Sequence, residues 1–137
     1  KEWQKPDIYA YRIYTTVEPC PMCMGAIYMS GVRNIAFASR DPWAGSTNLL
    51  GTTPYLSLKT MAVTGPLEPV FEEFAAALHM FHMLSSRRRP KFAEHCRGTL
   101  ASAVSLAENW LHDGVIQQAL DDGLDVGEFF SDVYMRV

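Results

Sequence analysis

A strand, a helix and a second strand follow one another within the first forty residues, and this order constrains the fold more than any other feature. Residues 8–16 are rich in β-branched and aromatic side chains, which predicts a strand that ends before Pro19. Residues 20–30 predict a helix that Gly31 terminates, and residues 33–39 predict the second strand. This order describes a βαβ unit, in which the two strands are parallel and the crossover is right-handed.

The next part of the chain predicts a second step of the same kind. Residues 41–54 are rich in glycine, proline and small polar residues, which indicates a loop. Residues 58–64 predict a third strand, Gly65-Pro66 predicts a turn, and residues 69–85 predict a long helix. We expect the apolar face of this helix to carry Phe71, Phe74, Ala75, Leu78, Phe81 and His82.

The last third of the chain predicts helices only. Leu100, Val104, Ala107 and Leu111 recur at the spacing of one helical face, which is either core or a subunit contact. Residues 115–122 and 128–135 predict two further short helices. We therefore expect an α/β domain over residues 1–89 and a helical extension over residues 90–137.

Composition limits the kinds of partner that this protein binds. The net charge is −3 and the sequence pI is about 5.8, which disfavours a large nucleic-acid footprint. One basic cluster, residues 87–91, reads most simply as a solvated helix end or loop. The chain has three cysteines and no apolar stretch long enough to cross a bilayer, and we expect no signal peptide. We expect a cytoplasmic protein with reduced thiols and no membrane partner.

Cys20 and Cys23 are the residues that most directly indicate chemistry. Two cysteines separated by two residues at the start of a helix place both sulfurs on one turn, near free N–H groups and the positive end of the helix dipole. These conditions stabilise thiolates, the form that binds metals. The spacing alone is compatible with a redox dithiol, half of a structural zinc site or part of a catalytic zinc site.

The sequence around the cysteines resembles a known family. Residues 18–27 (EPCPMCMGAI), 35–39 (IAFAS) and 41–45 (DPWAG) resemble the cytidine and deoxycytidylate deaminase superfamily, in particular the branch of tRNA adenosine deaminases and guanine deaminases. The resemblance covers roughly residues 8–85. It implies a three-layer α/β/α sandwich with a mixed, mainly parallel sheet.

The resemblance also implies a chemistry. It predicts a zinc ion (Zn2+) held by Cys20, Cys23 and one histidine, with water in the fourth position. Zinc lowers the pKa of such a water, and the resulting hydroxide deaminates a ring carbon while a glutamate moves the proton. We expect Glu18, Asp41 and Trp43 to lie on the substrate side of this site, although Glu18 could equally shape the turn before Pro19 and Trp43 could simply cover the core.

The family's His-x-Glu motif, which precedes the cysteines, is absent from the 137 residues. None of the four histidines has a glutamate two places later. His79, His82 or His95, the last beside Cys96, could replace the missing ligand, but a histidine on an apolar helix face is more often a core residue. His112 fits a helix end, where a cation meets the dipole. We expect the third ligand and the proton shuttle to come from a separate N-terminal segment, without which the sheet has an uncovered edge.

The sequence therefore predicts zinc-dependent hydrolytic deamination of a nucleobase, nucleoside or nucleotide. The acidic composition favours a small-molecule substrate, whereas the basic cluster at residues 87–91 keeps tRNA as a second substrate class. The alternative is a non-catalytic relative that uses its cysteines for a structural zinc or for assembly, and a redox dithiol is a weaker one. The resemblance also predicts a homodimer.

Overall fold

The computed structural model describes residues 7–86 and 90–134. The chain forms two compact units, one up to Ala76 and one from Ala77 onward. The limit between them lies within helix α2 (Pro69–Ser85). The domain limit expected at residue 89 is based on sequence character, not on compactness, and it stays a prediction.

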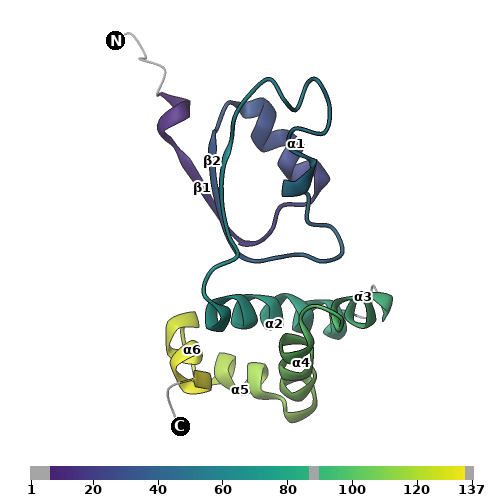
Figure 1. The fold of residues 1–137 in the computed structure, drawn as a ribbon. Helices are drawn as coiled ribbons and strands as arrows, with labels where there is room; N and C mark the ends of the chain where they lie inside the picture. Colours follow the sequence, from purple (N-terminus) through teal and green to yellow (C-terminus); the bar gives the residue numbers. More distant parts are fainter. Residues whose placement is uncertain (1–6, 87–89, 135–137) are drawn as a thin grey trace. The chain divides into compact units, whose positions relative to one another are not determined.

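The first unit contains a three-stranded parallel sheet, of which Figure 1 labels β1 and β2. Strand β1 (Arg12–Val17) pairs with β2 (Asn34–Ser39), which pairs with β3 (Ala62–Thr64), and both pairings are parallel. Helix α1 (Pro21–Ser30) connects β1 to β2. The predicted α/β class and βαβ unit are confirmed. The sheet was expected to be mixed and mainly parallel, and the described strands are all parallel.

Two predicted strands begin later than the sequence pattern indicated. Residues 8–10 form a short 3-10 helix, η1 (Ile8–Ala10), because the Asp7 side chain accepts a hydrogen bond of 3.1 Å from the Tyr9 N–H and stabilises a turn there. Strand β3 covers only the end of the range 58–64. The residues before it form turns held by Tyr28, whose hydroxyl donates to the Tyr55 carbonyl at 2.7 Å and accepts from the Lys59 N–H at 3.1 Å.

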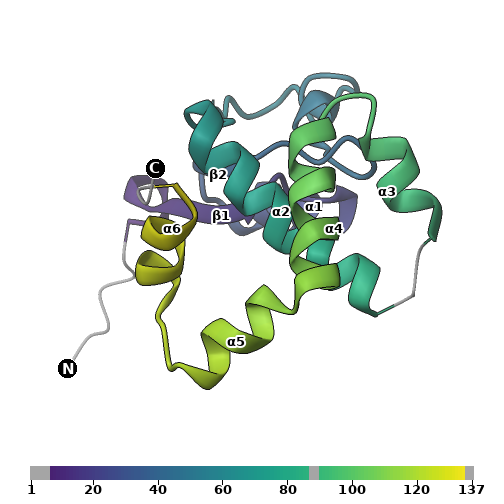
Figure 2. The ribbon, with the colours of Figure 1, turned by 90° about the horizontal axis from the view of Figure 1, so that it is seen from below.

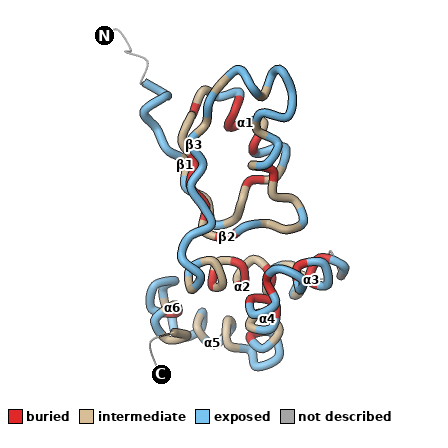
Figure 3. Tube along the Cα trace, in the orientation of Figure 1, coloured by how far each residue is buried: buried red, intermediate tan, exposed pale blue. Residues whose placement is uncertain are grey.

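The core of the first unit lies between α1 and the sheet. Met24, Ile27, Val32 and Ile35 are buried together, and Ile13, Leu50 and Met61 pack against them. Figure 3 shows this pattern as buried stretches on α1 and β2 next to exposed loops. A fully buried aliphatic side chain of this kind contributes about 1.5–3 kcal/mol. Because Gly31 adopts a left-handed conformation with φ 103°, α1 ends where the chain must turn back to β2.

Helix α2 has the predicted bounds, but its buried face differs from the prediction. Phe74, Ala77 and Met80 are buried, whereas Phe71 and His82 are exposed. At about 100° per residue, Phe71 and His82 lie about 120° and 140° from Ala77, the centre of the buried face. The expectation that both contribute to the apolar face is therefore wrong.

The second unit is helical from α2 onward (Figure 2). The helices are α3 (Pro90–Cys96), α4 (Ala101–Asp113), α5 (Val115–Asp121) and α6 (Val126–Tyr134). Helix α3 was not predicted, although Pro90 occupies its first position, where proline is favoured. The short 3-10 helix η2 (Thr47–Leu49) in the first unit was also not predicted.

The stripe expected along α4 is confirmed except at its end. Leu100, Val104 and Ala107 are buried, but Leu111 is 44% exposed and Trp110 is buried in its place. The Trp110 ring lies 5.3 Å from the ring of Phe129 on α6. Within residues 7–86 and 90–134, no helix combines the length and apolar composition needed to cross a membrane.

Candidate metal centre

Cys20 and Cys23 lie at the start of α1, where β1 has just ended. Cys20 is the N-cap residue with extended backbone angles (φ −69°, ψ 169°), and Pro21 occupies the first helical position. Pro21 has no N–H to leave unpaired and its ring favours the helical φ, so this short sequence begins a helix by itself. Both thiols are free, Cys20 half-buried and Cys23 exposed. The pair therefore lies at the carboxyl end of a parallel strand, where α/β proteins bind ligands.

At the start of the helix the two thiols have pKa values shifted in opposite directions. The pKa of Cys20 is lowered, first because the Cys23 N–H donates to its sulfur and second because the Cys23 side chain does so. The pKa of Cys23 is raised, first by its hydrogen bond to Cys20 and then by the charge of the Cys20 thiolate. Cys20 is thus the first of the pair to ionise, as a metal ligand must.

Glu18 holds the connection between β1 and α1 against the loop that follows β2. Its Oε1 accepts hydrogen bonds from the Thr47 N–H at 3.0 Å and the Thr47 hydroxyl at 2.5 Å. Its Oε2 accepts from the Asp41 N–H at 3.4 Å. Backbone bonds from Glu18 N to Ser39 O (2.8 Å) and from Ser46 N to Pro19 O (3.1 Å) join the same two segments. The loop is therefore fixed directly beside Cys20.

Asp41 and Gly45 give this loop its shape. Asp41 Oδ1 accepts from the N–H groups of Trp43 (2.9 Å) and Ala44 (3.1 Å), which closes a tight turn. A Cβ atom on Gly45 would lie 2.3 Å from Glu18 Oε2 and 2.6 Å from the Asp41 carbonyl oxygen, so only glycine fits without displacement. Trp43 is partly exposed at the turn. The substrate roles expected for Glu18, Asp41 and Trp43 stay predictions, while the first two have a defined structural role.

The other candidate ligands do not gather around one point. Cys96 is fully buried, whereas the neighbouring His95 is exposed, so the two do not share a site. His79 lies 5.2 Å, ring to ring, from Phe92, and His112 Nδ1 lies 2.6 Å from Asp113 Oδ1 near the end of α4. Among the residues that the structure describes, no three histidine, cysteine or acidic side chains are placed to hold a metal ion together.

The donor chemistry nevertheless suits zinc. Two thiols on one helical turn, one of them with a lowered pKa, supply two of the three protein ligands of a catalytic site or two of the four of a structural site. Cys20 and Cys23 as ligands stay predictions, because a third ligand is missing from the described part of the chain.

Two contacts that organise this region were not found from the sequence. Thr47 binds Glu18 across a separation of 29 residues, and Tyr28 binds the turns at residues 55 and 59. The spacing of Tyr28 from Met24 on one helical face could have indicated that it is buried. The partner of Glu18 has no comparable local signal.

Comparisons with known proteins support the resemblance around this site. Residues 2–39 match the family described as the cytidine and deoxycytidylate deaminase zinc-binding region. The chain is 45% identical over 38 residues to a tRNA-specific adenosine deaminase of Bacillus subtilis, covering 28% of this chain and 24% of that protein. It is 33% identical over 81 residues to a probable cytosine deaminase of Schizosaccharomyces pombe, covering 53% of this chain and 50% of that protein.

These matches cover only part of the chain and only part of each relative. The chain spans half or less of the length of these two relatives. The family match ends at Ser39 and therefore includes β1, both cysteines, α1 and β2. No solved structure matches the chain.

Proposed function

We propose that the protein is a zinc-dependent deaminase, because residues 2–39 match the zinc-binding region of the cytidine and deoxycytidylate deaminases. The proposed reaction is hydrolytic removal of an amino group from a cytosine, adenine or guanine base, nucleoside or nucleotide. The observation that carries the proposal is the pair Cys20 and Cys23 at the start of α1, inside the matched region.

Cys20 and Cys23 are proposed as two of the three protein ligands of the zinc ion. When bound, zinc lowers the pKa of a coordinated water and so provides a nucleophile at neutral pH. The N–H groups of the first turn of α1 hold the Cys20 thiolate, which prepares that ligand before the metal arrives. The third ligand and the proton-shuttling carboxylate are proposed to come from outside the described residues, since no complete ligand group exists within them.

The outer edge of β1 supports the proposal that a further segment supplies the third ligand and the carboxylate. Among the described residues no strand pairs with this edge, because β1 is the end strand in the order β1-β2-β3. Tyr14, in the middle of β1, is 74% exposed, so one face of this strand is uncovered as well as its edge. Natural proteins usually cover, shorten or charge such an edge, so a further segment of polypeptide is expected to lie against it.

The loop after β2 is proposed to form one side of the substrate pocket. Trp43 offers a partly exposed ring on which a base can stack, while Glu18 and Asp41 hold the loop in the position described above. The basic cluster at residues 87–91, which would favour tRNA, lies outside the described residues at positions 87–89, and Lys91 is exposed. The acidic composition makes a small-molecule substrate the primary proposal, with tRNA as the second.

The same proposal places the protein in the cytoplasm as a homodimer. Metal binding needs reduced thiols, and all three cysteines are free in the structure. The proposal of a dimer is based on the family resemblance. Light scattering, which gives the molar mass in solution, tests it.

A second candidate function is a non-catalytic deaminase relative with a structural zinc or an assembly role. It is favoured by one observation, the missing third ligand in the described part of the chain. A redox dithiol is a third candidate, which requires that the purified protein holds no zinc.

The test uses the full-length gene product, its zinc content and the release of ammonia from a panel of bases, nucleosides and tRNA. We expect bound zinc and ammonia release that disappears in Cys20→Ala, whereas Cys96→Ala, which removes the buried thiol, retains activity. Zinc without ammonia release from any substrate would overturn the enzyme proposal in favour of the structural one. Reduced protein without zinc would eliminate both.

A further inference from the structure

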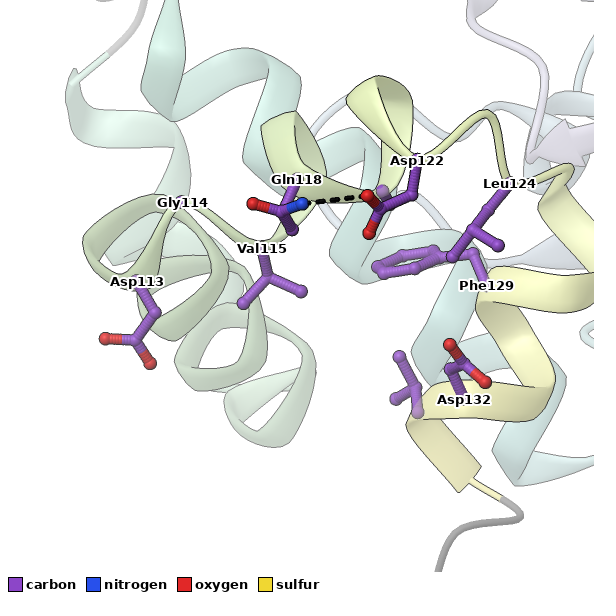
Figure 4. A pocket seen from close by; sticks show the side chains of 10 residues that line it. Asp113, Gly114, Val115, Gln118, Asp122, Leu124, Phe129 and Asp132 are labelled. Atoms are coloured by element: carbon purple, nitrogen blue, oxygen red, sulfur yellow. Dashed lines mark hydrogen bonds between the residues drawn. The ribbon is translucent and has the colours of Figure 1, made fainter.

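Two of the hollows in the second compact unit adjoin each other, and the proposed deaminase chemistry uses neither (Figure 4). The larger has a volume of about 370 Å³ and lies between the end of α4, α5 and α6. The smaller has a volume of about 120 Å³ and lies between α2, α5 and α6. They share Ala119, Leu124 and Phe129 as a common wall. We call the two together the α5–α6 groove.

The floor of the α5–α6 groove is apolar. Val115, Leu124 and Phe129 line the larger hollow, and Leu78, Ile116 and Val126 line the smaller. Leu120 and Val126, both at the smaller hollow, are 66% and 68% exposed. Large aliphatic side chains exposed beside an apolar hollow indicate a surface that a partner covers.

The rim of the groove is acidic. Residues 113–134 contain six carboxylates and neither lysine, arginine nor histidine. The six are Asp113, Asp121, Asp122, Asp125, Glu128 and Asp132. Figure 4 shows Asp113, Asp122 and Asp132 around the apolar side chains of the larger hollow.

Neutral donors supply hydrogen bonds to four of these carboxylates, whereas Asp113 Oδ1 lies 2.6 Å from His112 Nδ1. Asp121 and Asp122 each accept from a glutamine side chain four residues earlier, at 2.9 Å. Asp125 Oδ1 accepts from the Glu128 N–H, and Glu128 Oε2 accepts from the Asp125 N–H, both at 2.8 Å. These bonds fix Asp121, Asp122, Asp125 and Glu128 in place and leave the negative charge of these four side chains for a partner.

We propose that the α5–α6 groove binds a basic amphipathic helix of a partner protein. Apolar side chains at helical spacing would enter the two hollows, while lysine and arginine residues beside them would meet the acidic rim. The charge of residues 113–134 repels nucleic acid and anionic lipid, which excludes both as occupants. Two adjoining hollows along a surface fit the successive anchors of a helix better than they fit one compact ligand.

The test measures fluorescence anisotropy of a labelled amphipathic peptide of about 14 leucine and lysine residues, with leucines on one helical face. We expect saturable binding to the 137-residue chain that weakens as NaCl rises from about 50 mM to about 500 mM. A matched peptide with glutamate at every lysine position should not bind. Equal binding of both peptides, or no saturable binding of the basic one, would overturn the proposal.

Two variants locate the binding on the protein. Asp113→Asn with Asp122→Asn removes two rim charges and keeps the side-chain shapes, so binding should weaken about three- to tenfold. Ala119→Trp fills the shared wall of the hollows and should abolish binding. Glu94→Gln, the same loss of charge at an exposed position of α3, is the matched control and should bind normally.

Circular dichroism of each variant establishes that the helices remain. If the Asp113/Asp122 variant folds and binds as tightly as the unchanged protein, the peptide binds elsewhere and the proposal is wrong. If the protein sediments with zwitterionic lipid vesicles in the absence of peptide, the groove binds a membrane surface instead. That result would also overturn the proposal.

Discussion

In the first compact unit Cys20 and Cys23 lie at the surface at the start of α1, whereas in the second unit Cys96 is fully buried at the end of α3. The first pair is surrounded by backbone N–H groups that stabilise a thiolate, while Cys96 is buried as one of the core residues of its unit. The same side chain is thus reactive or inert according to the helix end at which it lies. Beside the cysteine pair of the first unit, hydrogen bonds to Glu18 hold a loop, whereas in the second unit a ring contact joins Trp110 to Phe129.

Metal binding gives the largest expected difference between the two units. Cys20→Ser or Cys23→Ser should lower the zinc affinity by about 100-fold or more, since each removes a direct ligand. Cys96→Ala should leave it unchanged. Competition with a chromogenic chelator measures the affinity, and equal zinc retention in all three variants would show that the metal lies elsewhere.

The ring pair of the helical unit gives an effect of comparable size. Trp110→Ala should lower the free energy of unfolding by about 3–5 kcal/mol, because Trp110 is only 4% exposed and packs on Phe129. Leu111→Ala, at the neighbouring exposed position, is the control and should cost less than about 1 kcal/mol. Urea unfolding followed by circular dichroism gives both values. A larger cost for Leu111→Ala would mean that α4 presents a different face to the core.

The loop beside Cys20 gives an effect of intermediate size in the first unit. Gly45→Ala should destabilise the protein by about 1–3 kcal/mol, because its Cβ would collide with Glu18 and Asp41. Gly25→Ala is the matched control within α1, where no atom lies within 4 Å of the added Cβ, and it should stabilise by about 0.5–1 kcal/mol. Thermal unfolding measures both. If both substitutions act alike, Glu18 does not hold the loop.

A smaller effect separates the two thiols of the pair. In metal-free protein Cys20 should react with iodoacetamide several-fold faster than Cys23 near neutral pH, because the pKa of Cys20 is lowered and that of Cys23 is raised. As pH rises, the rate at Cys20 should therefore reach its plateau first. Peptide mass spectrometry assigns the labelled site, with the unreactive Cys96 as an internal control. Preferential labelling of Cys23 would contradict the assignment.

The smallest expected effect compares one ion pair from each unit. The Glu72 side chain is mostly buried against Arg40, with Arg40 Nε 2.6 Å from Glu72 Oε1, and this pairing raises the pKa of Arg40. Glu72→Gln should cost about 0.5–1 kcal/mol. Glu108→Gln, which breaks the more exposed pair with Arg97, should cost less than about 0.5 kcal/mol. Chemical unfolding measures both losses of unfolding free energy. Equal losses would show that the two ion pairs do not differ in their contribution to stability.

Local signals in the sequence were sufficient for the elements around Cys20. Helix α1 was expected from residue 20 to residue 30, and it begins after Cys20 and ends at Gly31. Proline at the first position and glycine past the last act within a few residues, so their effect does not depend on distant parts of the chain. The parallel pairing of β1 and β2 followed from the same local order.

Local patterns were insufficient where tertiary contacts decide between neighbouring positions. The sequence pattern predicted that Leu111 is buried, whereas Trp110 is buried instead. Neighbouring helical positions point about 100° apart, and the contact between the Trp110 and Phe129 rings determines which of the two faces the core. The same reason moved the buried face of α2 away from Phe71 and His82.

By itself the sequence determined the βαβ unit, the start of α1 and the two thiols that this helix presents. Only the tertiary structure decided that Glu18 is held by Thr47, and that α5 and α6 leave hollows with an acidic rim. The physical reason is range. Helix caps, turns and strand patterns depend on interactions between a few adjacent residues. A hydrogen bond across 29 residues, or a hollow between helices, forms only after distant segments of the chain have packed together.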